Sequence, residues 1–493
     1  MSAVAAPDAF RTPEPSAILT PLDLLSLARR KPIHFMGIGG AGMLPLAELV
    51  RRNGGSITGC DSSDGVGSRA FRELGVPVEI GHSPDHLVGC GALVVTAAVR
   101  ADHPEIAAAR AAGIPVLKRA EALGAIVNRG TVVGISGTHG KTTTTALTTA
   151  ALAAGGLDPT GLVGGRVPAW NGNLRLGGDR LFVVEADEYD RSFHTLRPSI
   201  GVITTLEADH LDIYGSLAGV EEAFHTFLSS VPEDGLIIGC GDDPGVGRLL
   251  PRLVSRADRL LTYGLNAGSM LRAEEVRSAG VESQFEVRER GRRLGRVRLQ
   301  VPGAHNVRNA LAAIAVARHL DVGWDSIVEG LGSYSGVQRR FERIGEERGI
   351  LVIDDYAHHP TELEATLRAA RDAFPGRRLV AVFQPHLFSR TRDFAEEFGR
   401  ALALADRVFV TDIYPAREKP IPGVTGELLI GTAGRAGADV SYLPVRDEVV
   451  EQLIPELRSG DVCLMLGAGD LDEAARQLVA GLRGGTEAGT HAR

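Results

Sequence analysis

Short apolar runs alternate with stretches of helical periodicity along most of the chain, in three successive blocks. The first block opens with an apolar strand at 32–39 that runs into glycines, followed by an amphipathic helix at 43–52 and a strand at 56–61. Further strands are predicted at 92–99 and 114–120. Strands that alternate with helices in this way predict a parallel sheet covered by helices.

The second block repeats the pattern, with a strand, a glycine loop and an Ala- and Thr-rich helix over 131–156. An Arg-rich segment of alternating polarity at 282–301 predicts an inserted antiparallel β segment. The other elements expected in this block are strands at 181–187, 199–206 and 235–240 and helices at 220–230 and 306–320.

A third block begins near Tyr334 and contains helical stretches at 361–373 and 391–405. Its predicted strands lie at 350–357, 378–385, 407–414, 438–445 and 461–469. The chain is therefore expected to form three α/β domains, with boundaries near residues 127 and 335.

Composition narrows the classes of function. The 493 residues carry a formal net charge of −8, so no basic surface indicates nucleic-acid binding. No apolar run approaches the roughly 18–20 residues of a membrane span, and the first 20 residues, expected to be a disordered tail, lack the apolar core of a secretion signal. The cysteines have no CxxC spacing and no short-range His partner, so they are interpreted as buried thiols of a cytoplasmic protein rather than disulfides or a zinc site; they are Cys60, Cys90, Cys240 and Cys463.

A first glycine loop lies between the strand at 32–39 and the helix at 43–52. It satisfies G-x-G-x-x-G, and Asp61 ends the following strand. Glycines let the backbone approach a pyrophosphate, the helix N-terminus offers free N–H groups, and the acid can bind a ribose hydroxyl. The loop predicts a dinucleotide or nucleotide-diphosphate site, without separating NAD from other diphosphates or from an empty tight turn; its glycines are Gly37, Gly39, Gly40 and Gly42.

A second glycine loop ends in the Gly-Lys-Thr of a phosphate-binding loop. It is a variant, because Ile135 stands where the strict motif has its first glycine. Backbone amides are expected to cradle the phosphates of ATP, the lysine to neutralise the β and γ oxygens, and the threonine hydroxyl to bind Mg²⁺. The residues assigned to ATP here are Gly137, Thr138, His139, Gly140, Lys141, Thr142 and Thr143.

Partner ligands for Mg²⁺ are expected at the ends of neighbouring strands. Acidic runs occur at 185–190, after the strand at 181–187, and at 207–210. Such runs usually form solvated faces, but at the end of an apolar strand beside a phosphate loop Glu185 becomes a candidate metal ligand. His210 alone would more often be structural.

Together these motifs resemble the Mur ligase family. The resemblance extends from about residue 31 to about residue 475 and rests on segments in the family's order, which are HFMGIGGAGM, GISGTHGKTTTT, VVEADEYDRSF, LEADHLDIY, PGAHNVRNALAAIAVA, SGVQRRFE, DDYAHHPTE, FQPHLFSRTRDF, DIYPAREKPI and LGAGD. It implies a Rossmann-like UDP-sugar-binding domain at 21–126, a central P-loop ATPase-type domain at 127–334, and a Rossmann-like amino-acid-binding domain at 335–493 that moves to close the site.

The resemblance also implies a reaction. In the alanine-adding branch of the family, the lactyl carboxylate of UDP-N-acetylmuramate attacks the γ-phosphate of ATP, and L-alanine then attacks the acyl phosphate. This would be the first peptide step of peptidoglycan synthesis, in a bacterial cytoplasm, with ATP and Mg²⁺ as cofactors. A monomer or weak homodimer is expected.

Residue roles carry over from the same segments. Lys141, Glu185 and His210 would serve phosphoryl transfer, Glu185, His210 and Thr142 would hold Mg²⁺, and His139 would also contact the sugar substrate. Further contacts to ATP are implied for Asn306, Asn309, Arg340 and Asp354, and contacts to the amino acid for Tyr356, His358 and Arg390.

The sequence departs from the family pattern at Leu387, where some relatives have arginine, and at Arg417, where glycine is common. No lysine lies between Lys141 and Lys419, so the chain cannot use the carbamylated lysine of other branches. Two alternatives stay open. The segment at 185–190 also resembles the ligase that recycles murein tripeptides, although GIGGAGM favours the alanine branch. An NAD-dependent Rossmann oxidoreductase would explain the first glycine loop but leave the second unused.

Overall fold

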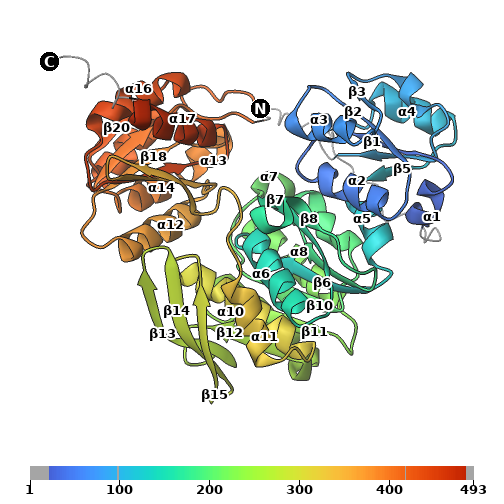
Figure 1. Ribbon diagram of the computed structural model, residues 1–493, viewed down its shortest axis with the longest axis horizontal. Helices are drawn as coiled ribbons and strands as arrows, with labels where there is room; N and C mark the ends of the chain where they lie inside the picture. The colour runs from blue at the N-terminus through green and yellow to red at the C-terminus, as the bar shows by residue number, and fades with distance from the viewer. Residues whose placement is uncertain (1–21, 97–98, 417, 485–493) are drawn as a thin grey trace, which may run out of the picture. The chain divides into compact units, whose positions relative to one another are not determined.

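A computed structural model describes residues 22–96, 99–416 and 418–484. The predicted tail at 1–20 and the departure at Arg417 lie outside these residues. The described chain contains three α/β sheets, one in each predicted block (Figure 1). Three α/β domains are thus confirmed as the fold class. The chain divides into two compact units, 1–129 and 130–493, and the second unit contains the second and third sheets.

The first sheet is wholly parallel, in the order β3-β2-β1-β4-β5. This is the strand order of the Rossmann fold, in which a ligand binds where the order reverses, beside the first strand. The elements of this sheet are β1 Ile33–Met36, β2 Ile57–Asp61, β3 Val78–Ile80, β4 Ala92–Val95 and β5 Val116–Lys118, with α1 Leu24–Ala28, α2 Met43–Arg52, α3 Val66–Glu73, η1 Pro84–Leu87, α4 Pro104–Ala111 and α5 Arg119–Val127.

The second sheet has ten strands, in the order β15-β14-β13-β12-β11-β10-β6-β9-β7-β8. Its middle is parallel, and the antiparallel insertion predicted over 282–301 is confirmed as β14 and β15. Strand β13, which precedes the predicted range, also pairs antiparallel with β14. The strands are β6 Thr131–Ser136, β7 Thr160–Val167, β8 Gly172–Arg175, β9 Leu181–Glu185, β10 Ile200–Ile203, β11 Leu236–Cys240, β12 Leu260–Gly264, β13 Leu271–Ala279, β14 Glu282–Glu289 and β15 Arg292–Leu299.

Helix α6 (Lys141–Ala154) packs against α10 (Ala304–His319) and α11 (Trp324–Gly332). Helices α6 and α10 are buried along most of their length, so the phosphate loop that precedes α6 rests on a rigid core. The remaining helical segments are α7 Leu211–Tyr214, α8 Leu217–Ser229, α9 Pro244–Leu249, η2 Pro168–Trp170, η3 Tyr189–Thr195 and η4 Leu250–Arg259.

The third sheet has the order β16-β17-β21-β18-β19-β20, and only β16 is antiparallel to its neighbour. Its strands are β16 Glu342–Glu347, β17 Ile350–Asp355, β18 Leu379–Phe383, β19 Arg407–Val410, β20 Val440–Tyr442 and β21 Val462–Leu466. The helices are α12 Pro360–Ala373, α13 Phe388–Asp393, α14 Ala395–Leu402, α15 Glu427–Arg435, α16 Val449–Leu453 and α17 Leu471–Gly484, with η5 Arg446–Glu448 and η6 Ile454–Glu456.

One predicted helix is broken. The sequence predicts continuous helix over 391–405, but α13 ends and α14 begins around Phe394, whose φ of −117° and ψ of 22° are not helical. The Phe394 ring packs edge-on against His359, 5.0 Å between ring centroids. The break in the helix therefore coincides with a tertiary contact that the sequence pattern does not reveal.

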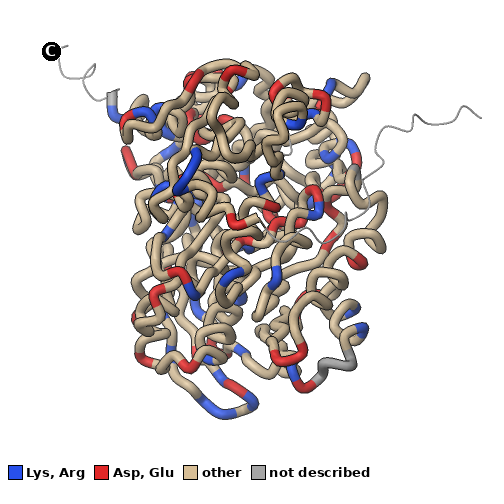
Figure 2. The backbone as a smooth tube through the Cα atoms, turned by 90° about the vertical axis from the view of Figure 1, so that its right-hand side faces the viewer, with Lys and Arg blue, Asp and Glu red and all other residues tan. Residues whose placement is uncertain are grey.

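In the view of Figure 2, basic and acidic positions are mixed over the backbone. Among the residues that the structure describes, no helix is both long enough and apolar enough to cross a membrane.

Candidate active site

The second glycine loop connects β6 to α6, and β6 lies between β10 and β9. Because these three strands are parallel, the residues that follow their carboxyl ends gather at one edge of the sheet. Glu185 ends β9, and residues 204–210 follow β10. The phosphate loop and the predicted metal ligands therefore reach the same edge.

Two positions of the loop require glycine. Gly137 has a φ of 134°, and a Cβ there would lie 2.0 Å from Thr204 Oγ1. Gly140 has a φ of 83°, and a Cβ there would lie 2.7 Å from Asn309 Oδ1. Both conformations favour glycine, and neither site has room for a side chain.

Hydrogen bonds to the segment after β10 fix the loop. The Thr138 amide donates to the Thr205 carbonyl over 3.0 Å, and the His139 amide to Thr205 Oγ1 over 2.8 Å. Thr204 Oγ1 donates to the His139 carbonyl over 2.5 Å. The amides at the start of α6 are thus held in position to face an anion.

Lys141, the first residue of α6, folds back across the loop. Its Nζ donates to the Gly137 carbonyl over 2.6 Å and to both carboxylate oxygens of Glu188, over 2.9 and 2.7 Å. Burial by itself would lower the pKa of Lys141, but Glu188 and Asp187 more than offset it and raise that pKa. The ammonium group therefore stays charged at the loop.

Thr142 and Glu185 meet beside the lysine. Thr142 Oγ1 donates to both Glu185 carboxylate oxygens, each over 3.0 Å, and the Gly164 amide donates to Glu185 Oε2 over 2.7 Å. A hydroxyl and a carboxylate at the first turn of a phosphate-loop helix are the oxygen donors that Mg²⁺ prefers. These two residues fit a magnesium ion.

His210 follows the same edge, at a left-handed φ of 52°. Its Nε2 lies 3.7 Å from Glu188 Oε1 and 3.8 Å from Asp209 Oδ2. Burial lowers the pKa of His210, with Asp209 opposing. The ring is therefore neutral near pH 7 and has a lone pair for a cation. The structure brings His210 to Glu188, and its place in a metal site stays a prediction.

The two asparagines of α10 lie behind the loop. Asn306 Nδ2 donates to the Pro302 carbonyl over 2.7 Å, and Asn309 Nδ2 to Asn306 Oδ1 over 3.3 Å. The close approach of Asn309 Oδ1 to Gly140 places this pair against the phosphate loop.

His139 joins the loop to the helix that follows β17. Its Nδ1 lies 3.2 Å from Glu362 Oε1, in the first turn of α12, and its Nε2 lies 3.6 Å from Glu207 Oε2. Thr361 Oγ1 donates to Glu207 Oε2 over 2.6 Å. Burial acts to lower the pKa of His139, but the carboxylates of Glu362 and Glu207 raise it to about 10. His139 is therefore an imidazolium held between two carboxylates.

Glu362 also forms ion pairs with residues that are assigned to the amino acid and to ATP. His358 Nδ1 lies 3.0 Å from Glu362 Oε2, and Arg340 Nη1 lies 3.5 Å from Glu362 Oε1. The Arg340 guanidinium lies 5.2 Å from the centroid of the Tyr356 ring, within cation–π range. Arg340, Tyr356 and His358 thus form one cluster.

Two other predicted residues occupy buried ion pairs. Arg390 Nη2 lies 2.6 Å from Asp209 Oδ1, and both side chains are under 10% exposed. Asp354 is fully buried in β17, with Arg339 Nε 3.3 Å away. Their predicted contacts to the amino acid and to ATP stay predictions.

The first glycine loop joins β1 to α2, as the sequence predicts. Gly37 has a φ of 77°, and the Gly39 amide donates to Asp61 Oδ2 over 3.0 Å. A Cβ at Gly39 would lie 2.7 Å from Ser68 Oγ and one at Gly42 3.2 Å from Arg119 Cδ. Asp61 therefore lies against the loop that would hold a diphosphate.

Three family models match in succession: Mur ligase family, catalytic domain, at 32–131; Mur ligase middle domain, at 135–317; and Mur ligase, glutamate ligase domain, at 339–469. A UDP-N-acetylmuramate–L-alanine ligase of Nitratidesulfovibrio vulgaris is 46% identical over 92% of this chain and 99% of its own. The chain belongs to the Mur ligase family.

Two solved structures of this family are similar along the chain. The UDP-N-acetylmuramate–alanine ligase of Thermotoga maritima is 30% identical with a TM-score of 0.78, covering 92% of this chain and 100% of its own. A murein peptide ligase of Psychrobacter arcticus is 26% identical with a TM-score of 0.67, covering 92% and 98%. Membership of a ligase family argues against the oxidoreductase alternative.

Several residues of this Mur ligase site do not stand out in the sequence. Glu188 belongs to the acidic run at 185–190, but nothing in the run distinguishes it from Glu185. Glu362 sits at the third position of α12, where it also forms a capping box with His359, so the sequence signal is a structural one. Asp209 and Glu207 acquire partners more than 130 residues away.

Leu387, which departs from the family's sequence pattern, also has an unusual backbone conformation. Leu387 adopts a left-handed φ of 69° directly before α13, the helix that carries Arg390. A branched side chain in this conformation is strained, and such strain is often found at functional sites.

Proposed function

We propose that this chain joins L-alanine to the lactyl carboxylate of UDP-N-acetylmuramate at the expense of ATP, the first peptide step of peptidoglycan synthesis. The observation that carries this proposal is the edge at which Lys141, Thr142 and Glu185 meet, in a chain of the Mur ligase family. Its alanine-ligase relatives match over more than nine-tenths of its length.

Lys141 and the amides at the start of α6 bind the phosphates of ATP. Phosphoryl transfer requires in-line positioning and neutralisation of the charge on the transferred group. The Lys141 ammonium is held 2.7 Å from Glu188. When ATP binds, the ammonium would turn from this carboxylate to the γ-phosphate, so it would have an anionic partner in both states. Glu188 is accordingly a positioning residue for Lys141.

Thr142, Glu185 and His210 would hold Mg²⁺, which would offset the negative charge of the phosphates. The Gly164 amide fixes Glu185 Oε2, leaving the carboxylate oriented toward Thr142. Asn306 and Asn309 then lie at the side of the loop assigned to the adenine end of ATP.

The chemistry is an activation followed by an acyl transfer. The lactyl carboxylate oxygen attacks the γ-phosphorus and ADP leaves. The L-alanine amine then attacks the acyl carbon, and inorganic phosphate leaves with one oxygen of the original carboxylate. Phosphate is a good leaving group where a carboxylate oxygen is not, which is why the reaction consumes ATP.

Residues of the third sheet would bind the amino acid. Arg390 can pair with its carboxylate as an additional partner beside Asp209, since a guanidinium has five donors. Tyr356 and His358 orient the amine end, and Arg340 contributes positive charge toward the nucleotide. In the first unit, the loop at 37–42 would bind the diphosphate of the sugar nucleotide and Asp61 its ribose. His139 would contact the sugar substrate from the phosphate loop.

ATP and a nucleotide sugar are cytoplasmic substrates, and all four cysteines are free and buried, as in a protein of a reducing compartment. We place the enzyme in the bacterial cytoplasm, as a monomer or weak homodimer.

The test is coupled ADP release with UDP-N-acetylmuramate and either L-alanine or the murein tripeptide as acceptor. ADP release that requires both the sugar nucleotide and L-alanine is the expected result. Release with the tripeptide but not with L-alanine would instead identify the chain as a recycling ligase. The murein peptide ligase of P. arcticus has a similar fold. ATP turnover that depends on neither would refute both.

A further inference from the structure

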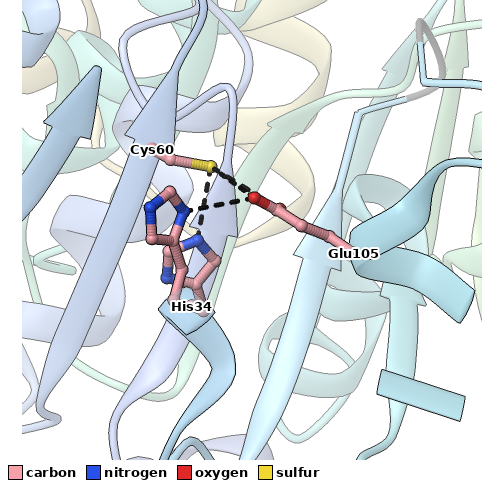
Figure 3. Close-up of side chains that lie close together, drawn as sticks. His34, Cys60 and Glu105 are labelled. Carbon is pink, nitrogen blue, oxygen red and sulfur yellow. Dashed lines mark hydrogen bonds and ion pairs between the residues drawn. The ribbon is translucent and has the colours of Figure 1, made fainter. Parts of the chain in front are cut away.

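A second cluster of chemistry-bearing side chains lies in the first unit, and none of its residues is among those assigned to the ligation. It consists of His34 on β1, Cys60 on β2, His86 on η1 and Glu105 in the first turn of α4. One ligand atom from each lies within 4.8 Å of every other. Figure 3 shows the His34, Cys60 and Glu105 side chains pointing toward one another from their separate elements.

The parallel register explains how two of them meet. His34 pairs with Thr58 across β1 and β2, and Cys60 lies two residues beyond Thr58. Side chains two apart on a strand share a face, so Thr58 and Cys60 lie on the same side of the sheet. His34 Nε2 is accordingly 3.3 Å from Cys60 Sγ, while its Nδ1 is 2.9 Å from Thr58 Oγ1.

The spacing of the ligand atoms suits a tetrahedral metal. With bonds of about 2.0–2.3 Å, as zinc makes to nitrogen, oxygen and sulfur, the edges of a tetrahedron are roughly 3.3–3.8 Å. The distances are 3.3 Å from His34 Nε2 to Cys60 Sγ, 3.7 Å from Cys60 Sγ to Glu105 Oε2, and 3.1 Å from His86 Nδ1 to Glu105 Oε1. Little movement is needed to seat an ion among them.

The buried charge of Glu105 is a second, independent reason to expect a cation here. Glu105 is fully buried, and its described partners are the Ser83 amide at 2.6 Å, His86 at 3.1 Å, His82 at 3.9 Å and the Cys60 thiol. None of these is a permanent cation, and a buried carboxylate without one is costly. A divalent ion with one thiolate, one carboxylate and two neutral imidazoles would have no net charge.

The hydrogen bonds around His34 and Glu105 would orient these side chains as metal ligands. His34 is buried, and its Nε2 faces Cys60 Sγ. Thr58 Oγ1 can accept from Nδ1–H and fix the tautomer that points Nε2 inward. The Ser83 amide holds the Glu105 carboxylate.

We propose that His34, Cys60, His86 and Glu105 form a binding site for a zinc-like divalent ion. Binding exchanges the thiol proton of Cys60 for a metal–sulfur bond. The thiol proton is released to solvent. The metal and sulfur keep their oxidation states.

The site is linked to the first glycine loop. The Cys60 carbonyl accepts from the Gly37 and Ile38 amides, over 2.8 and 3.2 Å, and the next residue, Asp61, accepts from Gly39. A metal that ties β1, β2, η1 and α4 together therefore holds the loop's anchor points. Its role is to stabilise this domain rather than to take part in ligation.

The test uses the full chain, purified without a histidine tag, stripped with chelator, reduced and titrated with Co²⁺. The expected result is a thiolate-to-cobalt charge-transfer band that corresponds to one equivalent of bound Co²⁺ and that Zn²⁺ displaces. Cys60→Ser should abolish the band, and Cys90→Ser, a buried thiol of the same domain outside the set, should keep it. The active-site residues and the cluster of His139, Glu207 and His359 contain no sulfur and cannot produce this band.

Two further variants separate ligation from folding. Thr58→Val should weaken Zn²⁺ binding roughly 10- to 100-fold through the orientation of His34. His86→Gln, at a partly exposed position, should weaken it at least as much while thermal unfolding shows a folded protein. Zn²⁺ should raise Tm in the wild type and not in Cys60→Ser. The absence of a thiolate band in the wild type, or its survival in Cys60→Ser, would overturn the proposal and leave a hydrogen-bonded cluster.

Discussion

Replacement of Lys141 by methionine isolates the contribution of one buried charge to phosphoryl transfer. The Lys141 side chain is 13% exposed, and its Nζ lies within 3 Å of both Glu188 oxygens, so it works in a partly desolvated setting. Two unit charges about 4 Å apart at an effective dielectric constant of about 20 interact by about 4 kcal/mol. Loss of that interaction with the transferring phosphate slows turnover by about 10³-fold.

Removal of Lys141 also leaves Glu188 buried without its partner, which by itself could distort the loop. The double variant Lys141→Met/Glu188→Gln separates the two effects. If the missing cation limits turnover, the double variant stays as slow as the single one. If the unpaired carboxylate limits it, the double variant recovers.

The assay is coupled ADP release at saturating substrates, with UDP-N-acetylmuramate binding measured separately by calorimetry. Binding should be unchanged, because the sugar nucleotide is assigned to the first unit. Lys31→Met, at an exposed lysine, is the matched control and should leave turnover unchanged. A kcat for Lys141→Met within about tenfold of the wild type would refute the reasoning.

Three other outcomes are expected. Gly140→Ala should destabilise the chain by about 1–3 kcal/mol in urea unfolding and weaken ATP binding, because φ is 83° and the new Cβ would meet Asn309; unchanged values would contradict this. The pKa of His139 is raised from 6.5 to about 10, so its stabilisation is complete below about pH 6.5 and lost as pH rises toward 10; the free energy of unfolding should fall across that window more steeply in the wild type than in His139→Gln, and equal slopes would exclude the ion pairs. Arg390→Gln leaves Asp209 buried and unpaired and should cost about 3–5 kcal/mol in urea unfolding, and a loss below about 1 kcal/mol would show that the pair is not buried in solution.

Parallel strands that are buried on both faces and appear as continuous apolar runs, such as β18 and β21, are predictable from the sequence. The strands β7 and β16 are not predicted, for the opposite reason. The first has glycine at three of its eight positions, and the second is an edge strand of mostly polar residues. Their pairing depends on neighbours that are distant in sequence.

In the active site too, some residues can be predicted from local sequence and others depend on distant neighbours. Lys141 and Thr142 follow from a local motif, since a phosphate loop is one continuous segment. The partners of Lys141 and His139 are fixed by tertiary packing, so Glu188 and Glu362 could not be chosen from acidic runs or helix caps. The cysteines illustrate the point most clearly. Their spacing argues against a zinc site, yet Cys60 faces histidines and a glutamate from other parts of the chain.

The most direct test of the central claim follows an oxygen atom. UDP-N-acetylmuramate labelled with ¹⁸O in its lactyl carboxylate is incubated with ATP, Mg²⁺ and L-alanine, and the products are measured by mass spectrometry. Ligation through an acyl phosphate predicts one ¹⁸O in each inorganic phosphate released, together with the L-alanyl product retaining the other. Product formed with unlabelled phosphate would contradict carboxylate attack on the γ-phosphate of ATP.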